Sequence, residues 1–239
     1  MIKRRDAIVG SLSGLAALSL PLRIEANSSI AKLLPPKKGP IVVAVVAGPN
    51  AAVIDFAGPW EVFNQVMIPS RGATMDDQMP FRTALVSDRT GVIEVEGGMQ
   101  LAPRFTYDTF PAQPNIIVMG AQGQHTPAKI AWIKKASVNA DVVMSVCTGA
   151  FLLAKTGLLD GLSATTHHAY YDDFAKAFPK VKLVRGPRYV ENGRIASAGG
   201  LASGIELALR VVERYFGDTV ARQTAVYMEY NRSSHRPIG

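Results

Sequence analysis

Cys147 is the only cysteine of the chain, and its neighbours place it where a reactive thiol could act. The apolar, β-branched run 141–146 before it predicts a buried strand, and the stretch 151–156 after it predicts a helix. This order is typical of a nucleophile elbow, in which a strand is followed by a nucleophile, a small residue such as Gly149 and a helix. We expect the helix N-terminus to favour the thiolate form of Cys147. An inert, buried cysteine is the alternative that position alone leaves open.

Two acidic residues, Asp55 and Glu61, lie in the otherwise apolar segment 53–63. A carboxyl group buried there would have a raised pKa and could hold a proton beside a thiol. Asp55 could instead cap the start of a helix, and Glu61 could lie on a solvent-exposed helix face. Either residue could therefore be the partner of the cysteine.

Four further residues are candidates for substrate binding or for support of the nucleophile. Gly120 and Ala121 follow a predicted strand, and the backbone N–H groups of such a turn can form an oxyanion hole, although many Gly-rich loops are only turns. Thr148 could direct its N–H and hydroxyl groups toward an anion, or simply begin a helix. His167 follows the segment 163–166 and could contact the cysteine pocket, or serve as a structural histidine.

The segments that must position these residues alternate between strand and helix patterns. Strands are predicted at 40–46, 82–86, 115–119, 141–146, 163–166 and 194–198, with a hairpin at 91–98. Helices are predicted at 53–67, 127–138, 151–156, 170–178, 202–216 and 218–230. This order predicts one α/β domain over residues 40–239, with a mostly parallel sheet and helices on both faces. Its ligand site is expected beyond the carboxyl ends of the strands, where Cys147 lies.

Charge and motif content narrow the classes of partner. Residues 1–38 hold seven basic and two acidic residues, and so carry +5 of the net charge of +7. The rest of the chain has no basic stripe interleaved with aromatic residues, so we expect no nucleic-acid partner. One cysteine, with no His-x-x-x-His spacing, predicts no metal site. No nucleotide-binding glycine motif is present, and we expect no cofactor.

The N-terminus has the order of an export signal. The basic residues Lys3, Arg4 and Arg5 precede an uncharged stretch at 7–22, and small residues surround a possible cut after Ala26. The pair Arg4–Arg5 is similar to a twin-arginine signal. We therefore expect a periplasmic protein without stable membrane insertion after cleavage, or a cytoplasmic one if the leader does not function. An uncleaved anchor is the alternative, and residues 27–39 are expected to form a linker.

Four segments together resemble the PfpI-type, class I glutamine amidotransferase-like superfamily, in its isonitrile hydratase-like branch. They are Asp-Phe-Ala-Gly-Pro-Trp-Glu at 55–61, Ser-Val-Cys-Thr-Gly-Ala at 145–150, and the segments 157–167 and 197–208. The resemblance covers residues 40–230. It implies a flavodoxin-like sandwich, a small-molecule substrate, no cofactor and, commonly, a homodimer.

The resemblance also implies roles for individual residues. Cys147 would be the nucleophile, Asp55 the acid and base, and Thr148 a supporting residue in the hydration of an isonitrile to an N-substituted formamide. A non-catalytic ligand-binding or redox-sensing module is one alternative, and a deglycase- or glyoxalase-like reaction that uses Glu61 is another. Thr148 stands where other branches have His, which disfavours a Cys-His hydrolase. Ala121 replaces the second glycine of the family's pair.

Overall fold

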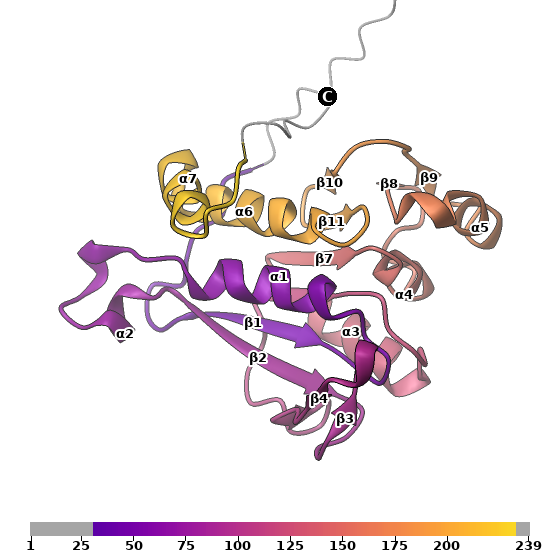
Figure 1. The fold of residues 1–239 in the computed structure, drawn as a ribbon, viewed down its shortest axis with the longest axis horizontal. Helices are drawn as coiled ribbons and strands as arrows, with labels where there is room; N and C mark the ends of the chain where they lie inside the picture. Colours follow the sequence, from indigo (N-terminus) through magenta and orange to yellow (C-terminus); the bar gives the residue numbers. More distant parts are fainter. Residues whose placement is uncertain (1–30, 233–239) are drawn as a thin grey trace, which may run out of the picture.

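The computed structural model describes residues 31–232 (Figure 1). The predicted leader and the first part of the predicted linker lie outside the described residues. Residues 31–40 form no helix or strand. The N–H of Leu33 donates to the carbonyl oxygen of Arg214 at 2.8 Å, and the Leu33 side chain packs against the core. This part of the linker is therefore attached to the domain.

The central sheet has seven strands in the order β10-β11-β7-β6-β1-β2-β5. Their bounds are β1 Ile41–Val46, β2 Phe81–Ser87, β5 Phe105–Thr106, β6 Ile116–Met119, β7 Val142–Val146, β10 Tyr189–Asn192 and β11 Ile195–Ala198. Every neighbouring pair is parallel except β10 and β11. The sheet therefore has its carboxyl ends along one edge, as a nearly parallel sheet requires.

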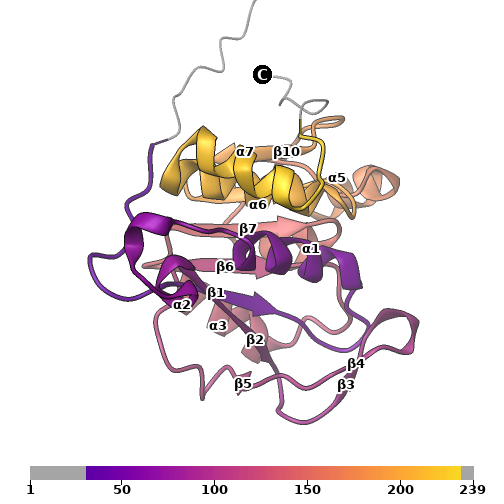
Figure 2. The same ribbon diagram turned by 60° about the vertical axis from the view of Figure 1, so that its left-hand side comes forward.

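Helices cover both faces of this sheet (Figures 1 and 2). On one face lie α1 Val53–Asn64 and α6 Ser203–Phe216, with α7 Asp218–Tyr227 packed on α6, and on the other lie α3 Pro127–Ser137 and α4 Gly149–Lys155. Side chains alternate along a strand, so Val43 and Val45 of β1 join the α1 core while Ala44 and Val46 join the α3 core. The expected flavodoxin-like sandwich is confirmed.

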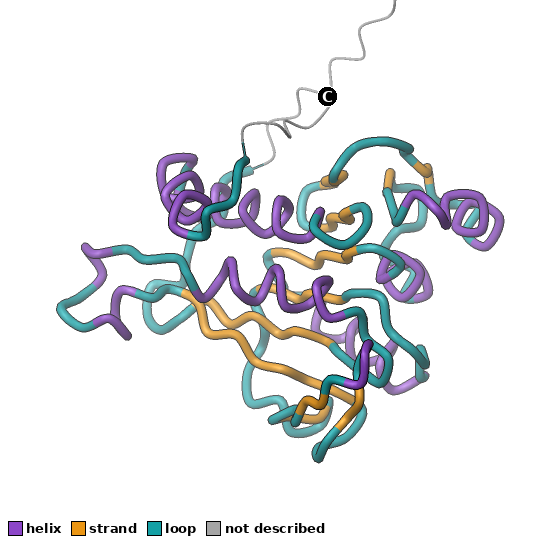
Figure 3. The backbone as a smooth tube through the Cα atoms, in the orientation of Figure 1, coloured by secondary structure: helices purple, strands orange, loops and turns teal. Residues whose placement is uncertain are grey.

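The remaining elements are short. They are α2 Met75–Gln78, α5 Tyr171–Ala177, the antiparallel pair β3 Ile93–Glu94 and β4 Gln100–Leu101, the parallel pair β8 Ser163–Ala164 and β9 Lys182–Leu183, and 3₁₀ turns at Pro69–Arg71, Glu96–Gly98 and His168–Tyr170. The segment between α1 and β2 is mostly loop and projects from the body (Figure 3). None of the helices within residues 31–232 is long and apolar enough to cross a membrane.

The predicted strand at 163–166 is the main difference from expectation. Only Ser163 and Ala164 form a strand, which pairs with β9 instead of joining the central sheet. The two threonines that follow turn toward the sheet edge instead. The N–H of Thr165 donates to Ser197 Oγ at 2.9 Å, and the hydroxyl of Thr166 donates to the carbonyl oxygen of Cys147 at 2.9 Å. Side-chain hydrogen bonds thus replace ladder pairing at this point.

Candidate active site

Cys147 directly follows β7 and has a φ of +59°, in the left-handed region. Its N–H donates to the carbonyl oxygens of Ala198 at 3.2 Å and Gly199 at 2.8 Å, while its own carbonyl accepts the bond from Thr166. A non-glycine residue in this conformation is strained and persists only when its surroundings hold it. These three hydrogen bonds stabilise the strained conformation of Cys147. The backbone has the geometry predicted for a nucleophile elbow.

The turn after Cys147 packs tightly against the end of β6. A Cβ atom added to Gly149 would clash with the carbonyl oxygen of Met119 and lie 2.9 Å from the carbonyl carbon of Gly120. Only glycine therefore allows α4 to start at this distance from β6. The close approach places Cys147 beside the loop at 120–123 and, through it, beside the start of α1.

Asp55 lies in the first turn of α1 and is completely buried. Its Oδ2 accepts a hydrogen bond of 2.8 Å from the N–H of Ala121, and the carbonyl oxygen of Ala121 accepts one of 2.9 Å from the N–H of Ala52. We call these two bonds the Ala121 clamp. A Cβ added to Gly120 would lie 2.5 Å from the Cβ of Asp55, so glycine is needed for this approach.

The clamp changes the role predicted for Gly120 and Ala121. The N–H of Ala121 is already bonded to the Asp55 carboxylate, so it is not available to a substrate oxyanion. Gly120 contributes the space that the close approach of Asp55 requires. The N–H of Ala121 therefore holds the carboxyl group instead of contributing to the expected oxyanion hole, and the oxyanion role of Gly120 stays a prediction.

The Asp55 carboxyl group and the Cys147 thiol each shift the pKa of the other. Burial raises the pKa of Asp55 to about 6; the hydrogen bond from Ala121 and the neighbouring Cys147 thiol oppose this rise, and the charge of Glu96 adds to it. Oδ1 of Asp55 is buried and has no hydrogen-bond partner among the described residues. This buried oxygen can therefore still accept a hydrogen bond or a proton.

The thiol of Cys147 keeps its proton at neutral pH. Burial raises its pKa to about 11, and the charge of Asp55 adds to this, while the backbone N–H groups of Thr148 and Leu201 act in the opposite direction. The expectation of a thiolate favoured by the helix is therefore wrong, because burial and a neighbouring carboxylate outweigh the N–H groups at the start of α4. Cys147 is only 6 % exposed.

Of the other predicted residues, Thr148 acts on Cys147 and Glu61 does not. The backbone N–H of Thr148 acts on the sulfur as expected, and its side chain caps no helix. Glu61 is exposed and accepts a hydrogen bond of 2.5 Å from the side-chain amide of Gln65, so the structure does not bring it to the cysteine. Positions six apart on a helix face different ways, and Asp55 therefore points inward while Glu61 points outward.

His167 lies at the rim rather than on the sulfur. Its Nδ1 accepts a hydrogen bond of 3.2 Å from the N–H of Ala169, and its ring stacks on His168 at 4.4 Å between centroids. The ring also packs against Gly200, next to the residue whose N–H acts on Cys147. It therefore supports the wall of the site, as a structural histidine would.

Two residues that influence the site were not predicted, Leu201 and Glu96. Leu201 has a φ of +50°, and the Gly199–Gly200 pair before it signals an unusual turn. Glu96 begins the turn between β3 and β4, and its N–H donates to the carbonyl oxygen of Ala51 at 3.0 Å. That bond joins the hairpin to the loop before α1, which explains why the charge of Glu96 acts on Asp55.

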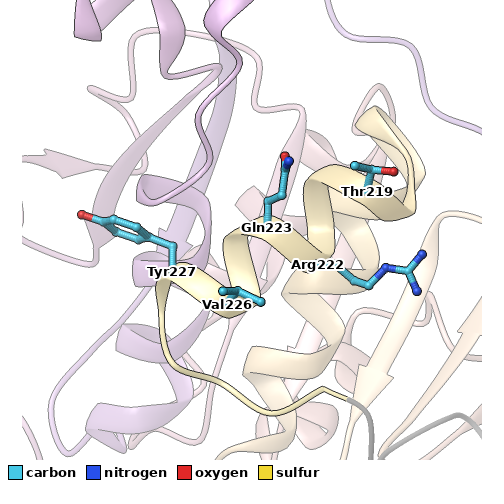
Figure 4. Close-up of a pocket in the computed structure, with 5 residues that line it drawn as sticks. All are labelled: Thr219, Arg222, Gln223, Val226 and Tyr227. Carbon is cyan, nitrogen blue, oxygen red and sulfur yellow. The ribbon is translucent and has the colours of Figure 1, made fainter.

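Two hollows lie elsewhere on the surface. A groove of about 490 Å³ between α1 and β2 is lined mainly by apolar side chains, among them Phe56, Trp60 and Leu101. A shallow hollow of about 410 Å³ on α7 is lined by Thr219, Arg222, Gln223, Val226 and Tyr227 (Figure 4). Within residues 31–232, no three His, Cys, Asp or Glu side chains gather closely enough to bind a metal ion.

Comparison with known proteins identifies the family. The model of the DJ-1/PfpI family matches residues 42–214, which include both Asp55 and Cys147. The chain belongs to the DJ-1/PfpI family. The chain is similar to the isonitrile hydratase of Pseudomonas putida. The two sequences are 27 % identical over 187 residues, which cover 76 % of this chain and 75 % of the hydratase.

Other similar proteins include a transcriptional regulator and a protein named only by its family. The HTH-type transcriptional regulator CdhR of Pseudomonas aeruginosa is 35 % identical over 100 residues, 42 % of this chain and 30 % of the regulator. A THiJ/PfpI family protein from Pseudomonas syringae has a crystal structure that matches with a TM-score of 0.70 at 20 % identity, covering 91 % of this chain and 84 % of that one. This last likeness supports the fold alone.

Proposed function

We propose that this DJ-1/PfpI protein hydrates an isonitrile to an N-substituted formamide, with Cys147 as nucleophile and Asp55 as acid and base. The observation that carries the proposal is the buried pair of a protonated thiol and a carboxylate whose pKa is about 6. The similarity to the isonitrile hydratase of Pseudomonas putida supports this choice of substrate. The pair needs no further charged group for the reaction.

The first step uses the unusual carbon of an isonitrile, which accepts both a proton and a nucleophile. Asp55 removes the proton of the Cys147 thiol and delivers it to the terminal carbon, while the sulfur forms a bond to the same carbon. The product is a thioimidate attached to Cys147. One carboxyl group suffices because the proton it receives is the proton it gives, and its pKa of about 6 permits both transfers near neutral pH.

The second step releases the product with water. A water molecule adds its oxygen to the thioimidate carbon, and one of its protons goes to the nitrogen. The carbon–sulfur bond then breaks, the other proton passes through Asp55 to the sulfur, and the formamide leaves. No electron is gained or lost overall. The backbone N–H groups of Thr148 and Leu201 stabilise the negative charge that develops on the departing sulfur.

The test is a substrate screen with the purified full chain. Alkyl and aryl isonitriles are incubated with wild type, Cys147→Ser and Asp55→Asn, and formamide is measured by chromatography. We expect product with wild type only, with losses of at least about 100-fold in the variants, since each removes a group that acts in the transition state. Folded wild type that yields no Cys147-dependent formamide from any isonitrile would reject the proposal.

A ligand-sensing module without turnover is the second candidate, and the similarity to CdhR favours it. A small molecule would then bind at Cys147 and raise the melting temperature without being converted. Redox sensing has less support, because oxidation of cysteine proceeds through the thiolate and Cys147 holds its proton. We do not propose a deglycase-like reaction, because Glu61 lies at the surface.

Location and assembly are further parts of the proposal. The order of residues 1–26 supports export, and the family resemblance supports a homodimer. Fractionation of cells that express the full chain, with Arg4 and Arg5 both changed to Lys as the control, tests export. Sedimentation of the purified protein tests the dimer. Protein retained in the cytoplasm, or a monomer at micromolar concentration, would contradict the respective part.

A further inference from the structure

A buried charge with an exposed counter-charge lies at the carboxyl end of the sheet, at Lys129 in the first turn of α3. The Lys129 side chain is completely buried, donates from Nζ to the carbonyl oxygen of Gln124 at 2.7 Å, and forms an ion pair of 3.3 Å with Asp88. Burying an ammonium group is costly even when it is paired. The proposed reaction does not use Lys129, so this cost needs another explanation.

The contacts of this group hold the loop at 120–124. Lys129 binds the end of the loop at Gln124, and the side-chain amide of Gln122 donates to the carbonyl oxygens of Val46 at 3.1 Å and Gly120 at 3.3 Å. The same loop carries the Ala121 clamp. The loop that orients the Asp55 carboxylate on the α1 side of the sheet is thus anchored on the α3 side.

The packing leaves little freedom at this anchor. A Cβ added to Gly48 would lie 3.0 Å from Nζ of Lys129 and 3.3 Å from Oε1 of Gln122. Both side chains therefore meet at one point beside the loop before α1. The N–H of Gly123 also donates to the carbonyl oxygen of Pro49 at 2.9 Å. A displacement of Lys129 would be transmitted to both loops at once.

Asp88 is the counter-charge of Lys129 in this group. Asp88 also accepts a hydrogen bond of 2.5 Å from the hydroxyl of Thr126, and its charge contributes to raising the pKa of Tyr107. Burial, together with the charges of Lys155 and Lys129, lowers the pKa of His125 to about 4, so His125 is neutral at pH 7. Removing Asp88 would therefore leave the buried Lys129 ammonium without its counter-charge.

We propose that the Lys129–Asp88 ion pair is a positioning device for Asp55, because it fixes the loop at 120–124 and so keeps the N–H of Ala121 on the Asp55 carboxylate. The proposal rests on the pairing of Asp55 with Cys147 and not on the identity of the substrate. It makes Lys129 and Asp88 positioning residues that touch neither the sulfur nor the substrate.

The expected consequence is a change in the pKa of Asp55. The hydrogen bond from Ala121 lowers that pKa. Loosening the loop in Lys129→Met or Asp88→Asn should therefore raise it by about one unit. Titration of ¹³C-labelled aspartate side chains by NMR measures this, and the spectrum of Asp55→Asn assigns the Asp55 signal. No turnover is needed, so failure of the isonitrile assay leaves this test intact.

A matched control separates positioning from general destabilisation. Arg214→Met removes another buried cation, whose partner is Glu191 on β10, and it should lower the melting temperature without moving the Asp55 titration. Asp88→Asn removes the same ion pair at an exposed position and leaves the buried Lys129 side chain unchanged. An Asp55 pKa equal to that of wild type in the folded Asp88→Asn variant would overturn the proposal.

Discussion

The carboxyl group of Asp55 and the thiol of Cys147 act on each other in opposite directions: the charge of Asp55 raises the pKa of the thiol, whereas the thiol lowers the pKa of Asp55. The proton therefore stays on sulfur until a reaction moves it. This arrangement differs from an activated thiolate, and it suits a substrate atom that must receive a proton and a nucleophile together.

The rate of isonitrile hydration should follow a bell-shaped pH profile. Activity should rise as pH passes through about 6, where Asp55 becomes a base, and fall as pH approaches about 11, where Cys147 loses the proton that the carbon needs. Measurements of kcat/KM between pH 5 and the alkaline limit of folding check this. A rate that keeps rising with hydroxide concentration through pH 10 would contradict it.

Asp55→Asn should make Cys147 more acidic while abolishing hydration. Removing the negative charge next to the thiol should lower its pKa by about one unit, which gives about tenfold faster alkylation at pH 8. Mass spectrometry of iodoacetamide labelling against pH measures this. Glu61→Gln is the control, since Glu61 is exposed and bonded to Gln65, and it should label at the wild-type rate. Slower labelling in Asp55→Asn would argue against the pairing.

Asp55→Asn should also stabilise the protein at neutral pH. The folded pKa of Asp55, about 6, lies above the ordinary aspartate value of 3.8, so the native state holds a proton that the unfolded state releases, and stability falls as pH rises from about 4 to 6. The variant escapes this loss, which is about 2–3 kcal/mol at pH 7 and close to zero at pH 3. Urea unfolding at pH 4 and pH 7 tests it. Equal changes in stability at the two pH values would exclude the mechanism.

Gly120→Ala should disrupt the site, whereas Ala121→Gly should not. A Cβ at Gly120 would lie 2.5 Å from the Cβ of Asp55, so α1 must shift, at an expected cost of about 1–3 kcal/mol and about 100-fold in activity. Ala121→Gly keeps the N–H and carbonyl of the Ala121 clamp and should retain activity within about threefold, because only a methyl group is lost. Thermal unfolding and turnover of both variants provide the comparison.

Two adjacent buried threonines offer a similarly matched pair. Thr166 donates to the carbonyl oxygen of Cys147, so Thr166→Val leaves that oxygen without this partner and should cost about 1–3 kcal/mol and reduce turnover. The hydroxyl of Thr165 is buried and has no partner among the described residues, so Thr165→Val should be neutral or stabilising. Equal losses in the two variants would show that the bond to the elbow contributes little.

The sequence predicted the long elements of the fold because their side-chain patterns extend over several residues. The strands β1, β2, β6 and β7 and the helices α1, α3 and α6 lie within a few residues of their predicted bounds. Strands β5, β9 and β10 were not predicted, because they have only two to four residues and, unlike β6, no continuous apolar run. Their formation depends on partner strands that are distant in the sequence.

The site was predictable in its residues but not in its electrostatics. The elbow at Cys147 and the acidic candidate Asp55 follow from local patterns. The protonation of the thiol does not, because it depends on the burial of both groups and on their proximity in space. Leu201 and Glu96 were missed for the same reason. The N–H of Leu201 and the exposed carboxylate of Glu96 reach the site because of the backbone turns in which they lie, and local sequence patterns do not reveal those turns.

In the Ala121 clamp, the main-chain N–H of Ala121 donates to the Asp55 carboxylate and its carbonyl oxygen accepts from the N–H of Ala52. Any residue except proline presents the same N–H and carbonyl groups at position 121. The side chain at position 121 can therefore change during evolution without loss of the N–H that holds the Asp55 carboxylate. Homologous enzymes could then differ in substrate at this position and keep the same reaction.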